Sequence, residues 1–187
     1  MKFKISFNAP VVLSFVIICF LAMLANYITG GVSNELLFMT CHTSLSSPMT
    51  YVRFFTHVFG HSGWEHFIGN AAYLLLLGPM LEEKYGSGKI VEIILITAFA
   101  TALVNYLFFW NVALCGASGV CFAFILLTSF TGFKDGEIPV TFILVAIIFI
   151  GQEMIQGITV QDDVSNISHI VGGIVGAVIG YRLNKKK

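Results

Sequence analysis

Long apolar segments, separated by short polar ones, run along most of the chain. We interpret six of them as membrane-spanning helices, at about residues 9–28, 64–81, 90–109, 117–132, 138–155 and 166–183. The longest connection runs from about residue 29 to residue 63, and it is too apolar for a free linker. We therefore expect an all-α membrane protein, with this long connection half-embedded at the outer membrane interface.

The composition agrees with a membrane protein. The 187 residues are 57% apolar and 11% charged, whereas a soluble domain of this length carries about twice that charge. We expect a single domain over residues 1–187, and the absence of a nucleotide motif predicts no nucleic-acid partner. The cysteines do not indicate a disulfide framework, because Cys19, Cys115 and Cys121 lie in or beside apolar segments, where cysteine behaves as a small apolar residue.

The positive charges predict the orientation in the membrane. With the six spans above, only Arg53 falls on the outer side. The positive-inside rule then places both termini in the cytoplasm of a multi-pass protein of the cell membrane. Lys2 and Lys4 also resemble the start of a signal peptide. However, the first apolar segment is long and no small-x-small site ends it, so we expect a true span. The nine charges on the inner side are Lys2, Lys4, Lys84, Lys89, Lys134, Arg182, Lys185, Lys186 and Lys187.

A serine flanked by small residues is the first candidate for chemistry. Ser118 lies in the sequence Cys-Gly-Ala-Ser-Gly-Val, where a loop turns into the fourth span. Small neighbours allow close approach of a substrate, and the first helical turn offers free N–H groups to an oxyanion. The residues from Ser118 to Thr131 rise only about 20 Å, against a hydrocarbon core of about 30 Å. We therefore expect Ser118 at the floor of a cavity, about 10 Å below the outer surface.

Other polar residues fall at the same predicted depth. His66 and Asn70 are four residues apart on one helix face, near the outer end of the second span. His169 lies near the outer end of the sixth span, on the face that carries Gly172 and Gly176. Each could instead serve interhelical hydrogen bonding for stability. Their convergence with Ser118 on one side of the membrane favours a functional site.

Three histidines close together also raise the possibility of a zinc site. His57, His61 and His66 precede or begin the second span. However, Glu65-His66 does not form an H-E-x-x-H motif, and no second ligand follows at metal-binding spacing. We therefore expect no metal and no other cofactor.

Taken in order, these motifs resemble the rhomboid family of intramembrane serine proteases. The resemblance covers the chain from about Arg53 to Arg182 and implies a rhomboid-like bundle of six transmembrane helices, like that of the compact bacterial members. The matching residues are Arg53, His57, His61-x4-His66-x3-Asn70, the Gly86-Ser87-Gly88-Lys89 turn, Gly116-Ala117-Ser118-Gly119 and His169-x2-Gly172-x3-Gly176.

The resemblance also implies roles for these residues. Ser118 would be the nucleophile and His169 the general base of a Ser–His dyad, with His66, Asn70 and the Ser118 N–H binding the oxyanion. Phe122 stands where a tyrosine is frequent, and its ring would pack against His169. Two further departures are Val52, in place of a tryptophan, and Ser168, in place of an alanine. Structural support would come from Arg53, His61, Glu82, Gly116, Gly119, Gly172 and Gly176.

The function expected from this resemblance is cleavage of membrane-anchored proteins near the outer face. Its partners would be transmembrane substrates and the bilayer, and it would need no cofactor. The main alternative is a non-catalytic rhomboid-like protein that binds transmembrane helices, which would be expected to lack Ser118 or His169. A channel or transporter would call for broken helices in paired halves, and no repeat indicates them.

Overall fold

The computed structural model describes residues 6–132, 137–159 and 163–185, and this part of the chain is built from helices. The expectation of an all-α protein is confirmed for these residues. Five of the nine positive charges that we assigned to the inner side lie outside the described residues: Lys2, Lys4, Lys134, Lys186 and Lys187. The elements are α1 (Pro10–Ile28), η1 (Asn34–Phe38), α2 (Pro48–Thr56), η2 (His57–Phe59), α3 (Trp64–Tyr85), α4 (Ser87–Phe108), α5 (Ser118–Thr128), α6 (Val140–Thr159) and α7 (Asp163–Asn184).

Each predicted span contains one helix, and the ends shift by a few residues. By length and hydropathy, α1 and α4 are sufficient to cross a membrane, and Ser118–Thr128 and Val140–Phe149 are shorter apolar helices. The number of six spans therefore stays a prediction. The turn before α4 differs from expectation in one detail. Gly86 has the positive φ of +84° that the turn requires, whereas Gly88 lies inside the first turn of α4.

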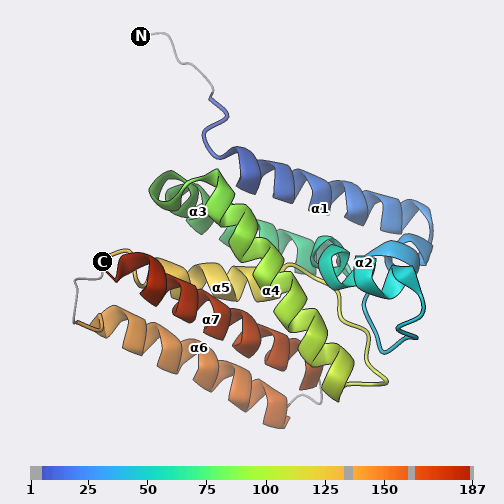
Figure 1. Cartoon of the computed structure of the whole chain (residues 1–187). Helices are drawn as coiled ribbons and strands as arrows, with labels where there is room; N and C mark the ends of the chain where they lie inside the picture. Colours follow the sequence, from blue (N-terminus) through green and yellow to red (C-terminus); the bar gives the residue numbers. More distant parts are fainter. Residues whose placement is uncertain (1–5, 133–136, 160–162, 186–187) are drawn as a thin grey trace.

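The helices form a bundle in which α1 and α6 lie at opposite edges (Figure 1). α1 packs against α3, α6 packs against α7, and α4 crosses the bundle in contact with α1, α3, α5 and α7. α5 lies inside, where most of its side chains are buried and where it contacts α3, α4, α6 and α7. Its 11 residues rise only about 17 Å, so α5 is half as long as α3, α4 and α7, which have 22 residues each.

The long connection before α3 is more ordered than the sequence predicted. It contains α2, and Phe54 of that helix packs edge-on against Tyr106 of α4, with ring centroids 5.5 Å apart. A two-way backbone pairing joins the same connection to the segment before α5. The Thr40 N–H donates to the Leu114 oxygen over 2.9 Å, and the Leu114 N–H donates to the Thr40 oxygen over 2.8 Å.

The tightest contact in the bundle is between α5 and α7. A Cβ atom added to Gly172 would overlap the carbonyl oxygen of Gly119, and one added to Gly176 would overlap that of Ala123. The two backbones therefore touch directly, as small residues at four-residue spacing allow between membrane helices. Gly173, on the neighbouring face, would place a Cβ at an ordinary 3.6 Å from Leu126.

These contacts predict opposite effects for two neighbouring substitutions. Gly172→Ala should lower the free energy of unfolding by about 1–3 kcal/mol, because the added methyl forces α5 and α7 apart. Gly173→Ala is the matched control. It should be neutral or stabilising by up to about 1 kcal/mol, because alanine favours the helix. Thermal unfolding of both variants in the same detergent would measure the difference, and equal melting temperatures would contradict the close contact.

Candidate active site

Ser118 is the first residue of α5, and a glycine two residues earlier shapes the approach to it. Gly116 has φ +131°, a conformation that side-chain-bearing residues rarely adopt. Its N–H donates to the carbonyl oxygen of His57 over 2.9 Å. Ser118 itself is half-buried, so its hydroxyl is not sealed into the core.

His66, in the first turn of α3, packs directly on this glycine. A Cβ atom at position 116 would lie 2.7 Å from Cε1 and 2.8 Å from Nε2 of the His66 ring. Only glycine leaves room for the imidazole. The other ring nitrogen, Nδ1, lies 3.1 Å from the Ser62 hydroxyl oxygen. The Nε2 side of His66 therefore faces the segment that leads into Ser118.

Asn70 lies one helical turn after His66 and contacts the first turn of α5. Its side chain is 7% exposed. The Cys121 sulfur lies 3.6 Å from the Asn70 side-chain oxygen and 3.5 Å from its backbone oxygen. Within the described part of the chain, the buried Asn70 Nδ2 has no hydrogen-bond partner. Asn70 thus keeps a buried donor that the fold itself does not use.

His169, on α7, is held against α5 by an aromatic ring. The rings of Phe122 and His169 are stacked, with centroids 4.4 Å apart and planes inclined by 3°. Phe122 is four residues after Ser118, so both lie on the same face of α5. The structure therefore holds His169 against α5 one helical turn after Ser118.

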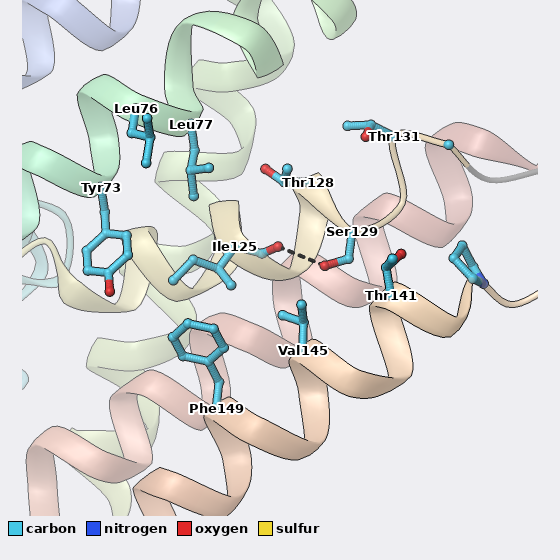
Figure 2. Close-up of a pocket in the computed structure, with 12 residues that line it drawn as sticks. Tyr73, Leu76, Leu77, Ile125, Thr128, Ser129, Thr131, Thr141, Val145 and Phe149 are labelled. Atoms are coloured by element: carbon cyan, nitrogen blue, oxygen red, sulfur yellow. Dashed lines mark hydrogen bonds between the residues drawn. The ribbon is translucent and has the colours of Figure 1, made fainter.

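An apolar pocket lies between α3, α5 and α6. Phe149 of α6 lines this pocket and packs edge-on against Phe122, with centroids 5.5 Å apart. Figure 2 shows Tyr73 and Leu77 of α3 on one side of the pocket and Val145 of α6 on the other. The pocket lies along the second half of α5 and does not include Ser118.

His57 links the connection between α1 and α3 to the segment before Ser118, and the sequence did not predict this link. Its Nδ1 lies 3.2 Å from the carbonyl oxygen of Arg53, and its Nε2 lies 3.2 Å from the Thr101 hydroxyl of α4. Because a carbonyl only accepts, Nδ1 carries the proton. The Thr101 hydroxyl beside Nε2 also lies 2.9 Å from the carbonyl oxygen of Thr97. The backbone oxygen of His57 receives the Gly116 N–H. A contact through a backbone carbonyl leaves no signature in the sequence.

His61 is a buried neighbour of His66. The two rings lie 5.1 Å apart and nearly perpendicular, and His61 Nδ1 donates to the Phe59 carbonyl oxygen over 3.1 Å. The Asn34 side chain donates to the His61 carbonyl oxygen over 2.9 Å. Among the side chains that the structure describes, no group of three histidines, cysteines or acidic residues is placed to bind a metal.

Arg53, Glu82 and Gly119 make contacts between elements of the fold. Arg53 Nε donates to the Leu36 carbonyl oxygen over 3.0 Å, which ties α2 to η1. The buried Glu82 carboxylate accepts the N–H groups of Val11 and Val12, each over 3.0 Å, and so caps the start of α1. Gly119 faces α7, where an added Cβ would lie 3.4 Å from the Ser168 carbonyl oxygen.

Comparison with known proteins decides the family. A model of the rhomboid domain matches residues 48–186. The chain belongs to the rhomboid family. Rhomboid proteins are embedded in membranes, which agrees with the apolar helices α1 and α4.

Curated rhomboid proteins from distant organisms are similar to this chain. It is 29% identical over 138 residues to Rhomboid-related protein 1 of Caenorhabditis elegans, covering 69% of this chain and 39% of that protein. It is 30% identical over 141 residues to Rhomboid protease GlpG of Salmonella newport (strain SL254), covering 72% of this chain and 50% of that protein. RHOMBOID-like protein 7 of Arabidopsis thaliana is 25% identical over 137 residues, covering 70% of this chain and 42% of that protein. The chain thus matches half of the length of these relatives or less.

Burial lowers the pKa of two histidines in the connection between α1 and α3 of this rhomboid protein. Loss of solvent lowers the pKa of His57 from 6.5 to about 4, although hydrogen bonds to backbone groups of Arg53 and Phe54 oppose the shift. Burial, with a smaller contribution from nearby His66, lowers the pKa of His61 from 6.5 to about 4. Both rings are therefore neutral in the folded protein near neutral pH.

These shifts predict a protein that loses stability in mild acid. As pH falls below about 6.5, the unfolded chain binds protons that folded His57 and His61 resist until about pH 4. The contribution of these two histidines to the free energy of unfolding should therefore be fully present above pH 6.5 and be lost between there and about pH 4, by on the order of 3 kcal/mol per histidine. Thermal unfolding in detergent across the window would measure the loss. A flat profile, or an unchanged slope in His57→Gln, would contradict it.

Proposed function

We propose that this protein is an intramembrane serine endopeptidase that cleaves membrane-anchored proteins, with Ser118 as the nucleophile and His169 as the general base. The observation that carries the proposal is the stacking of His169 on Phe122, one helical turn after Ser118. The similarity to Rhomboid protease GlpG supports the same reaction class.

In this mechanism His169 takes the proton of the Ser118 hydroxyl as its oxygen attacks the scissile carbonyl carbon. It then returns the proton to the leaving amine, and a water molecule hydrolyses the acyl-enzyme with the same base. The Phe122 ring restricts the imidazole to one plane, because the two rings lie parallel at 4.4 Å. The arrangement thus orients the base by packing.

The negative charge that develops on the carbonyl oxygen needs donors, and three groups are suited to supply them. The Ser118 N–H lies at the start of α5, where helical N–H groups have no internal partner. His66 directs its Nε2 side toward Gly116, and with Nδ1 accepting from Ser62, Nε2 carries a proton. Asn70 contributes its unpaired Nδ2. We propose that these three groups bind the oxyanion.

The proposal includes the placement of this site in the membrane. Helices α1, α3, α4, α5, α6 and α7 would be the six spans, with both termini in the cytoplasm and Ser118 near the outer face. The short α5 supports a serine below the surface, reached by water from outside. A substrate would need a segment that unwinds near that face, because a hydrogen-bonded helix hides its carbonyl groups.

Labelling with a fluorophosphonate probe tests the nucleophile directly. The wild-type protein should be labelled at Ser118, and Ser118→Ala should not be labelled.

Ser118→Ala and His169→Ala should each lower the cleavage rate by roughly 10⁴-fold or more, and the double variant should be no worse, because the two act as one unit. Ser129→Ala is the matched control, since this half-buried serine at the other end of α5 bonds to the Ile125 carbonyl oxygen. Undiminished labelling of Ser118→Ala would overturn the assignment of the nucleophile, and a folded wild-type protein that is not labelled would favour a helix-binding protein.

Replacement of the oxyanion donors should give a graded loss. His66→Ala and Asn70→Ala should each lower kcat by up to about 10²–10³-fold and leave measurable turnover, because each removes a single donor. Steady-state kinetics in detergent, with thermal unfolding to verify the fold, would measure both. A folded His66→Ala variant as inactive as His169→Ala would show that His66, and not His169, is the base.

A further inference from the structure

The thiol of Cys121 is in contact with a polar group, although the sequence predicted a small apolar residue there. Cys121 is 2% exposed, in the first turn of α5, three residues after Ser118. Its sulfur lies 3.6 Å from the side-chain oxygen of Asn70 and 3.5 Å from the backbone oxygen. Both of these oxygens are acceptors, so the S–H group is the donor.

This contact determines which end of the Asn70 amide remains available. When its oxygen faces the thiol, the amide leaves its NH₂ group without a hydrogen-bond partner. Asn70 is only 7% exposed, so this unpaired group is buried. A flipped amide would place NH₂ against sulfur, which is only a weak acceptor. It would also turn an oxygen toward the position of the oxyanion, where it would repel the developing charge.

We propose that Cys121 is a positioning residue, whose thiol fixes the orientation of the Asn70 amide so that its NH₂ group serves the oxyanion. This proposal rests on the proposed function, because it assigns Asn70 a role in that reaction. An S–H···O hydrogen bond is weak, so the thiol selects between two amide orientations and adds little to the strength of either. Its effect should fall on kcat, since the oxyanion forms after the substrate has bound.

Two substitutions of nearly equal shape separate hydrogen bonding from packing. Cys121→Val removes the donor and should lower kcat about three- to tenfold with little change in KM. Cys121→Thr has the same branched shape but restores an O–H donor, so it should retain a clearly higher kcat. Equal losses in both variants would mean that Cys121 acts by packing alone, and would overturn the proposal.

A double-mutant cycle tests whether the effect passes through Asn70. In an Asn70→Ala background, Cys121→Val should have no further effect on kcat, because no amide remains to be oriented. A second loss of equal size in that background would overturn the proposal. So would an unchanged kcat in Asn70→Ala alone, while loss of turnover in Ser118→Ala would still uphold the serine mechanism.

The contact can also be observed without turnover. An infrared difference spectrum of wild type minus Cys121→Val isolates the S–H stretching band of Cys121. This band should lie at lower frequency than the same band in Asn70→Ala, where the side-chain acceptor is missing. Cys19→Val is the matched control, since Cys19 is also a buried thiol, 1% exposed, whose sulfur lies 3.7 Å from the Val58 carbonyl oxygen. It should leave kcat unchanged, and identical Cys121 bands in both backgrounds would overturn the proposal.

Discussion

The direct contact between the backbones of α5 and α7 is the constraint on which the rest of the site depends. It exists because Gly172 and Gly176 present no side chain to Gly119 and Ala123. In lipid, where apolar side chains gain little by leaving their solvent, such close packing is a main source of helix association. The same contact fixes the register of α7 against α5. That register stacks His169 on Phe122, one turn after Ser118.

A second set of contacts positions the segment that enters α5. Two backbone contacts attach this segment to the connection between α1 and α3: Leu114 pairs with Thr40, and the Gly116 N–H donates to the His57 carbonyl oxygen. His57 is in turn anchored to α4 through Thr101. The position of Ser118 is therefore determined by residues more than 50 positions away in the sequence. Residues of the connection between α1 and α3 thereby position the segment that leads into Ser118.

Periodic and local features of the site could be predicted from the sequence. Apolar segments gave the approximate helix ends, four-residue spacing placed His66 and Asn70 on one face of α3, and the glycine spacing placed Gly172 and Gly176 toward a neighbouring helix. α2 was missed, because its nine residues are too few for a periodic signal to stand out among aromatic neighbours. The His57 carbonyl and the Cys121 thiol were missed for another reason. Each acts through a long-range contact that residue type does not reveal.

The arrangement of polar groups bears on how the proposed Ser–His dyad would work within a membrane. Each proposed catalytic side chain has an orienting neighbour: the Ser62 hydroxyl for His66, the Cys121 thiol for Asn70 and the Phe122 ring for His169. These partners are small, uncharged or aromatic, so orienting the site adds no charge to a region where charge is costly to bury. Donors that are already oriented need little reorganisation when the oxyanion forms, which is the main source of electrostatic catalysis.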